Sequence, residues 1–225
     1  MKKLILIAVT ICLIALTSFM SLQKKKVLFF GDSITQAGVK PGGYIIKIGE
    51  LVAKDGLTDQ FELIGSGIGG NKVYDLFLRM EEDVFSKTPD VVLIYVGVND
   101  VWHKQSSGTG TDADKFEKFY AAIIKKLQKK NIKIIMCTPA VIGERTDFTN
   151  QLDGDLNKYS NIIRGLAQKN SIPLVDLRKA FLDYNIQFNK ENKESGILTT
   201  DRVHLNDEGN KIVAEEMWKA IKTMI

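Results

Sequence analysis

Cysteine is nearly absent from this sequence, and its scarcity excludes a fold held together by disulfides. Only Cys12 and Cys137 occur among the 225 residues. Cys12 lies inside an apolar N-terminal stretch, so the two thiols offer no disulfide framework to the folded part of the chain. Cys137 ends the apolar run 132–137, which is typical of a buried strand, and we expect it to be a small buried hydrophobe rather than a nucleophile.

Histidine is equally scarce, with His103 and His204 as its only representatives. Two histidines among scattered carboxylates do not make a ligand set, so the sequence predicts neither a metal ion nor another cofactor. The scarcity also narrows the search for a general base, because histidine is the side chain that titrates closest to neutral pH.

A strong excess of one charge is also missing. The formal net charge is +4, and five basic residues (Lys2, Lys3 and the run 24–26) flank the N-terminal apolar stretch, so the remainder is close to neutral. Four lysines lie together near the end of a predicted helix: Lys125, Lys126, Lys129 and Lys130. We expect them to form a solvated face that complements the helix dipole. A nucleic-acid partner is therefore not expected, because it requires a clustered basic face.

The N-terminus carries the one long hydrophobic run, residues 4–20, directly after Lys2 and Lys3. A positive region followed by such a run is typical of an export signal. Its 17 residues lie at the lower edge of what spans a bilayer, and no clear small-residue cleavage site follows. We expect residues 1–23 to be a signal peptide or a membrane anchor, and the protein to be exported: periplasmic, extracellular or tethered to a membrane. A buried helix is disfavoured because the run has no polar stripe.

Beyond residue 26, short apolar runs alternate with amphipathic stretches. The runs expected to form strands are 27–30, 61–64, 91–96, 132–136 and 172–175. Apolar residues at helical spacing fill the intervals, over the ranges 44–53, 73–84, 116–127, 156–166 and 212–221. Strands that alternate with helices imply right-handed βαβ units. The sequence thus predicts an α/β fold, a three-layer α/β/α sandwich with about five parallel strands. Asn206 is expected to cap the last helix, and the polar segment 181–200 to be a surface loop.

Polar, glycine-containing clusters follow the predicted strands. Gly31-Asp32-Ser33 follows the first strand, residues 65–71 the second, and Gly97-Val98-Asn99-Asp100 the third. Ligands of open parallel sheets bind at the carboxyl ends of the strands, so these clusters are expected to line one edge. A further cluster, Asp201-Arg202-Val203-His204, stands just before the last helix.

These four blocks, in this order, resemble the SGNH hydrolases, also called the GDSL family of esterases and lipases. The resemblance covers essentially the whole chain after residue 26 and implies a flavodoxin-like α/β/α fold in one hydrolase domain, residues 24–225. It implies a serine esterase that hydrolyses carboxylic esters through an acyl-enzyme. In one departure from the family's pattern, Gly65 stands where the second block usually has asparagine.

The resemblance also implies roles for individual residues, and the residue types suit them. Ser33 would be the nucleophile, His204 the general base that accepts its proton, and Asp201 the residue that orients the imidazole. The oxyanion of the tetrahedral intermediate would be bound by the backbone N–H groups of Ser33 and Gly70 and by the side-chain amide of Asn99.

Three other polar residues near these blocks are expected to have different roles. Asp32 and Asp100 are expected to support their loops rather than to act on the substrate. His103 is expected to be a surface side chain.

Other functions remain open at this point. Residues 33–36 could bind a phosphate in a non-catalytic flavodoxin-like protein, and a catalytically inactive relative could bind glycans. Within the family, lysophospholipases and thioesterases are the alternatives. Export and the polar loop 143–154, with Phe148 as its single aromatic residue, favour small acyl groups such as acetyl on a glycan. The expected partner is thus a small-molecule or glycan ester.

Overall fold

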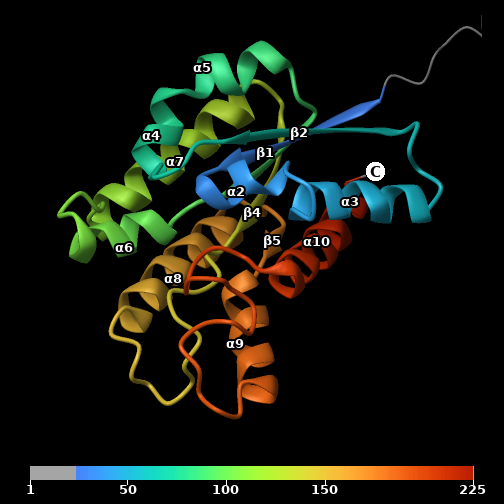
Figure 1. The fold of residues 1–225 in the computed structure, drawn as a ribbon. Coiled ribbons are helices and arrows are strands. Elements are labelled where there is room, and N and C mark those ends of the chain that lie inside the picture. The colour runs from blue at the N-terminus through green and yellow to red at the C-terminus, as the bar shows by residue number, and fades with distance from the viewer. Residues whose placement is uncertain (1–23, 225) are drawn as a thin grey trace, which may run out of the picture.

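The structure is a computed structural model that describes residues 24–224. The predicted signal peptide or anchor, residues 1–23, lies outside the described residues. A single parallel sheet with the strand order β2-β1-β3-β4-β5 forms the centre (Figure 1). Its strands are β1 (Lys25–Gly31), β2 (Phe61–Gly67), β3 (Val91–Tyr95), β4 (Lys133–Cys137) and β5 (Leu174–Val175).

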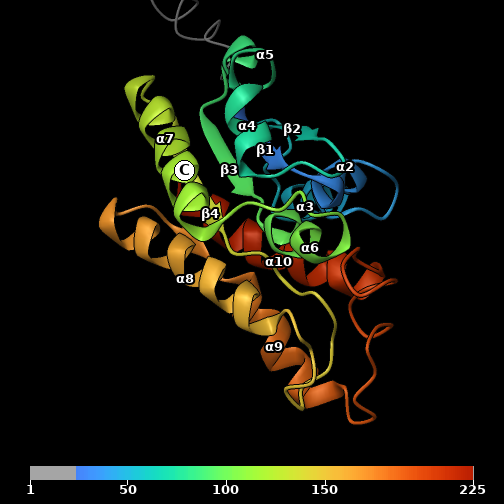
Figure 2. The same ribbon diagram turned by 90° about the vertical axis from the view of Figure 1, so that its left-hand side faces the viewer.

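Helices cover both faces of the sheet. Their bounds are α2 (Ser33–Gly38), α3 (Tyr44–Lys54), α4 (Val73–Leu78), α5 (Met80–Asp83), the 3₁₀ turn η1 (Phe85–Lys87), α6 (Val98–Ser106), α7 (Ala113–Lys129), α8 (Asp153–Lys169), α9 (Leu177–Phe188) and α10 (Asp207–Lys222). Helices α3 and α10 pack together on one face, and α4, α7 and α8 lie on the other (Figure 2). The predicted three-layer sandwich with five parallel strands is confirmed.

The central strands are buried on both faces, as their uninterrupted apolar sequences predict. Residues 27–30 of β1 and 91–94 of β3 have no exposed surface. The register aligns Gly31 with Gly67 of β2 and with Tyr95 of β3. The three strands therefore end at one level, and the polar clusters that follow them meet at one edge. The chain order reverses between β1 and β3, the place where open α/β sheets bind ligands.

The structure corrects the expectation that residues 181–200 form a loop. Helix α9 covers Leu177–Phe188, and only the remainder is irregular. Asp176 caps this helix by accepting a hydrogen bond from the backbone N–H of Lys179 at 3.2 Å. The buried positions Leu177, Phe181 and Asn185 recur every fourth residue, and the polar identity of Asn185 masked this helical stripe in the sequence.

Two further boundaries differ from the predictions. The predicted helix 73–84 divides into α4 and α5 at Arg79, whose guanidinium turns inward to the ends of β1 and β2. The predicted strand 172–175 is reduced to Leu174–Val175. Other expectations hold: Cys137 is buried with a free thiol, and Asn206 caps α10 by accepting from the N–H of Gly209 at 2.9 Å.

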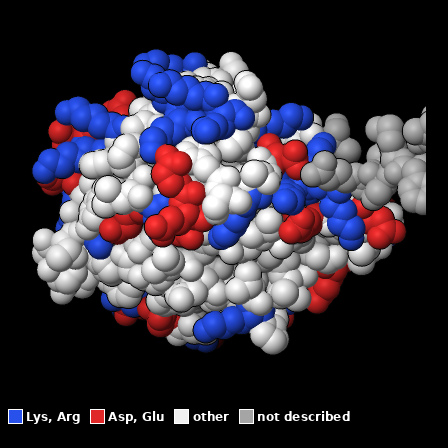
Figure 3. Space-filling view, turned by 90° about the horizontal axis from the view of Figure 1, so that it is seen from above, with Lys and Arg blue, Asp and Glu red and all other residues white. Residues whose placement is uncertain are grey.

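In the view of Figure 3, basic side chains gather in the upper part, acidic side chains lie mostly below them, and much of the lower part carries no charge. In the lysine-rich end of α7, Lys126 pairs with Glu81 at 3.4 Å and lies over the ring of Phe77, as expected of a solvated helix face. Within residues 24–224, no helix combines the length and the apolar character needed to cross a membrane.

Candidate active site

Ser33 is placed by a tight turn at the end of β1. Gly31 is required there, because a Cβ at this position would lie 2.2 Å from Thr35 Oγ1 and 2.4 Å from the carbonyl oxygen of Tyr95. Asp32 then caps α2, its carboxylate accepting from the N–H of Ile34 at 3.0 Å. Ser33 is the first residue of α2, so its own N–H has no partner within the helix and remains available to a ligand.

The hydroxyl of Ser33 meets the imidazole of His204, although 171 positions separate them in the chain. Ser33 Oγ lies 2.9 Å from His204 Nε2, and His204 Nδ1 lies 2.7 Å from Asp201 Oδ2. An ionised carboxylate can only accept, so Nδ1 carries the proton and Nε2 is left to accept the proton of Ser33. The three side chains thus form one directed chain of hydrogen bonds from the hydroxyl to the carboxylate.

Asp201 is fixed by its own backbone as well as by the imidazole. Its Oδ1 accepts from the N–H groups of His204 at 2.8 Å and Val203 at 3.2 Å. Partial burial raises the pKa of Asp201, but the hydrogen bonds from His204 and Val203 outweigh it and hold the pKa below its ordinary value. The carboxylate is therefore ionised at neutral pH, as an acceptor for Nδ1–H must be.

The loop after β2 brings Gly70 to the other side of Ser33. Gly70 has a φ of +77°, a left-handed conformation that favours glycine. A Cβ built on its neighbour Gly69 would lie 3.9 Å from the Cβ of Ser33, so the two loops are in contact. Asn99, 2% exposed in the first turn of α6, donates one amide hydrogen to the carbonyl of Asn71 at 3.1 Å. Its second amide hydrogen has no partner among residues 24–224.

Asp100 joins helix α6 to the end of the loop that carries Gly70. Its carboxylate is fully buried and accepts from the N–H of Val73 at 3.2 and 3.3 Å. Burial raises the pKa of Asp100 to about 6, and the N–H of Val73 offsets only part of this rise. The expected supporting role of Asp100 is confirmed, because its hydrogen bond joins α6 to the start of α4.

Asp32 is also buried, and its environment disfavours the charged form. Burial raises the pKa of Asp32 from 3.8 to about 7; the N–H of Ile34 opposes this rise, and the charge of Asp100 adds to it. Asp32 is 1% exposed and makes no hydrogen bond to the His204 ring among the interactions within residues 24–224. Asp201, not Asp32, is therefore the carboxylate that contacts the imidazole.

We expect the stability of Asp32→Asn relative to the wild type to increase with pH. Between about pH 4 and 7 the folded wild type binds more protons at Asp32 than the unfolded chain, so its free energy of unfolding falls as pH rises. Asparagine does not titrate, and its carbonyl can still accept from Ile34. Thermal melts should show that the Tm of the variant, relative to that of the wild type, is several degrees higher at about pH 8 than at about pH 5. A difference that stays constant over this range would contradict the raised pKa.

Two basic residues missed by the sequence analysis fix the loops. Lys72, only 7% exposed, donates from Nζ to the carbonyl of Gly70 at 3.2 Å. Arg79 donates to the carbonyl of Gly31 at 2.7 Å and to Asn71 Oδ1 at 2.8 Å. Neither belongs to a motif; they are the cap residues at the two ends of α4.

His103 lies closer to the site than the sequence suggested. It follows Asn99 by four residues on α6, so both project from one face of that helix. Its Cε1 would lie 3.9 Å from a Cβ built on Gly70, and the side chain is half-buried rather than exposed. Burial, and then the charge of Lys72, lower the pKa of His103, which favours a neutral ring beside Gly70.

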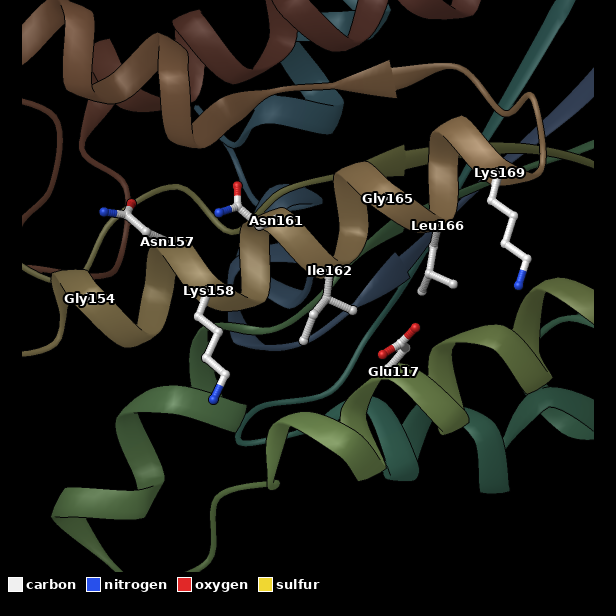
Figure 4. Close-up of a pocket in the computed structure, with 9 residues that line it drawn as sticks. All are labelled: Glu117, Gly154, Asn157, Lys158, Asn161, Ile162, Gly165, Leu166 and Lys169. Carbon is white, nitrogen blue, oxygen red and sulfur yellow. The ribbon is translucent and has the colours of Figure 1, made fainter.

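A separate groove of about 680 Å³ lies between α7 and α8 (Figure 4). Ile162 and Leu166 from α8 and Glu117 from α7 point into it, with Lys158 and Lys169 near its ends. None of its lining residues takes part in the Ser33–His204–Asp201 hydrogen bonds, and we assign it no role in the chemistry.

A serine, a histidine and an aspartate are hydrogen-bonded in series at the switch point of this parallel sheet. This arrangement places the protein in the class of serine hydrolases. The chain belongs to the GDSL-like Lipase/Acylhydrolase family, whose model matches residues 29–212. It is a carboxylic ester hydrolase, as the resemblance in the sequence implies.

Several proteins to which this chain is similar are acetylxylan esterases. The chain is 29% identical over 213 residues to the acetylxylan esterase of Geobacillus stearothermophilus, covering 88% of this chain and 94% of that protein. The crystal structure of the acetyl xylan esterase AlAXEase is 67% identical, with a TM-score of 0.86, covering 87% of this chain and 99% of that one. Two solved structures are catalytic mutants of Axe2, an acetylxylan esterase from Geobacillus stearothermophilus. In one an aspartate is replaced by alanine, and in the other a histidine three positions later is replaced by alanine. Each is 26% identical to this chain, with TM-scores of 0.76 and 0.74. Each alignment covers 90% of this chain and 96% of that one.

Proposed function

We propose that Ser33 attacks the ester carbonyl while His204 accepts its proton and Asp201 stabilises the resulting imidazolium. The hydrogen-bonded series from Oγ to Oδ2 is the observation that carries this assignment. A serine hydroxyl is a poor nucleophile until a base takes its proton, and Nε2 at 2.9 Å is placed to do so. The aspartate and histidine of the Axe2 catalytic mutants have the spacing of Asp201 and His204, which supports the same roles.

The oxyanion formed by this attack is bound, in this proposal, by three donors around Ser33. These are the N–H of Ser33 in the first turn of α2, the N–H of Gly70, and the second amide hydrogen of Asn99. Lys72 holds the Gly70 carbonyl and Asp100 holds the neighbouring turn, so the donors are fixed before the substrate arrives. Collapse of the intermediate releases the alcohol and leaves an acyl group on Ser33, which water then removes.

For the substrate, we propose acetyl esters of a glycan, with xylan-type oligosaccharides as the first class to test. The 67% identity to an acetyl xylan esterase over most of the chain is the main support. The N-terminal pattern of residues 1–23 is consistent with it, because an exported enzyme meets polysaccharides outside the cell. We propose accordingly that the protein is exported, with these residues as its signal or its membrane anchor.

We expect kcat/KM to fall steeply as the acyl chain of the ester lengthens, and acetylated xylo-oligosaccharides to be deacetylated. The direct test compares p-nitrophenyl acetate, butyrate and octanoate, together with acetylated xylo-oligosaccharides and a lysophospholipid as competing substrates. The acetyl esters should be preferred by about tenfold or more over octanoate, since each misfitting methylene costs on the order of 1 kcal/mol. A preference for octanoate or for the lysophospholipid would refute the acetyl assignment but leave the esterase assignment intact.

A further inference from the structure

Glu144 is a buried carboxylate outside every motif of the family resemblance. It is 1% exposed, and its two oxygens accept four hydrogen bonds. Oε2 accepts from the N–H of Ile197 at 2.8 Å, and Oε1 accepts from the N–H groups of Leu198 at 2.7 Å and Thr199 at 2.6 Å. The hydroxyl of Thr199 donates the fourth, at 2.9 Å to Oε1. All four donors belong to one segment of three residues, which ends two residues before Asp201.

The same segment is joined directly to the turn that carries Asp201 and His204. The hydroxyl oxygen of Thr199, which donates to Glu144, also accepts from the N–H of Arg202 at 3.2 Å. The N–H of Thr200 donates to the carbonyl of His204 at 2.8 Å and closes the turn. A single bridging hydroxyl thus connects the Glu144 carboxylate to the residue that follows Asp201.

The turn also needs support, because Arg202 has a φ of +83°. A residue with a side chain is rarely found in this left-handed region, and such conformations persist where the surroundings determine them. The carbonyl of Arg202 accepts from the N–H of Gly143 at 2.8 Å, so the neighbour of Glu144 holds the turn from a second side. Glu144 is itself fixed, since its carbonyl accepts from the side chain of Asn189 at 2.9 Å.

We propose that Glu144 is a positioning residue for the reaction: its carboxylate holds residues 197–206 so that His204 and Asp201 meet Ser33. Backbone N–H groups bind a carboxylate more strongly than a neutral oxygen, so a buried glutamate fixes this loop better than an amide would. Catalytic side chains lose efficiency when displaced by fractions of an ångström to one ångström, and His204 depends on this loop for its location. The inference rests on the proposed roles of Ser33, His204 and Asp201.

Glu144→Gln is the primary test. The amide keeps the shape but replaces one accepting oxygen by an NH₂ group that faces a backbone N–H. We expect kcat for p-nitrophenyl acetate to fall about 10- to 100-fold with KM changed by less than about threefold, because proton transfer and not substrate binding depends on the loop. Glu191→Gln is the matched control: it removes a charge from the same region, but Glu191 is 74% exposed and pairs with Lys193 on the surface, away from the turn at Arg202. Its kcat should stay within about twofold of the wild type.

A double-mutant cycle with Asp201→Asn separates positioning from a general loss of stability. If Glu144 acts through the His204–Asp201 pair, Glu144→Gln should cost much less in the Asp201→Asn background than in the wild type. Equal losses in both backgrounds, or a kcat of Glu144→Gln no lower than that of Glu191→Gln, would overturn the proposal. If Glu144→Gln does not fold, Thr199→Val carries the same test, because it removes only the hydroxyl that joins Glu144 to Arg202. Failure of the proposed function is distinguishable, since Asp201→Asn alone would then retain activity.

Discussion

Ser33→Ala should fold as the wild type does and lose on the order of 10⁴-fold or more in kcat on p-nitrophenyl acetate. The side chain contributes one hydroxyl to the site, and its main contact is His204 Nε2 at 2.9 Å. The turn around it is held by Gly31, by the Asp32 cap and by Arg79, none of which uses the Ser33 hydroxyl. Loss of the hydroxyl therefore removes the nucleophile without removing its surroundings.

Two measurements make this result decisive. The thermal midpoint of Ser33→Ala should lie within a few degrees of the wild type, since among the described residues Oγ makes a single hydrogen bond, to His204 Nε2. Saturating substrate should not restore the rate per mole of enzyme, because the defect lies in kcat. An esterase rate comparable with that of the wild type would show that another residue attacks the ester.

Asp201→Asn should lower kcat at neutral pH by about 10⁴-fold. Asparagine fits the same space, but its carbonyl accepts less strongly than a carboxylate, and its NH₂ group can instead donate to Nδ1. The imidazole then favours the tautomer in which Nε2 carries the proton. In that tautomer Nε2 cannot accept the proton of Ser33. The imidazolium formed during the attack also loses its negative partner at 2.7 Å.

Asp32→Asn is the matched control for this prediction, because both variants change a carboxylate to an amide within the same site. Asp32 caps α2 and contacts Ile34, whereas Asp201 contacts His204 Nδ1. We expect Asp32→Asn to lose far less activity than Asp201→Asn when rates are compared per folded molecule. The reverse order of losses would mean that Asp32 is the acid partner of His204.

The location of the site could be predicted from the sequence, because buried parallel strands are recognisable as uninterrupted apolar runs. The apolar runs of β1 and β3 are long and β-branched or aromatic, and polar residues with glycine follow each of them directly. Those patterns predicted that Ser33 and Asn99 lie at one edge of the sheet, and the aligned ends of Gly31, Gly67 and Tyr95 place them there. The meeting of Ser33 with His204 came from the family resemblance, since no local pattern links residues 171 positions apart.

The supporting residues could not be predicted, because their roles depend on contacts between distant segments. Glu144 and its donors at 197–199 are 53 to 55 positions apart, and nothing in the polar stretch 143–154 distinguishes this buried carboxylate from its exposed neighbours. Phe148 in the same stretch is 96% exposed, although it is the one aromatic side chain there. Hydrophobicity alone therefore does not decide which side chains of this loop are buried, because tertiary hydrogen bonds hold Glu144 inside.

The most direct test of the central claim is to label the protein with a fluorophosphonate and map the modified residue by mass spectrometry. A fluorophosphonate reacts with a serine whose proton is removed by a neighbouring base and whose developing oxyanion is bound. We expect one modification per chain, on Ser33, and strongly reduced labelling in His204→Ala and in Asp201→Asn. Label on any other residue, or labelling of Ser33 at the wild-type rate in His204→Ala, would contradict the assignment of Ser33 as nucleophile and His204 as its base.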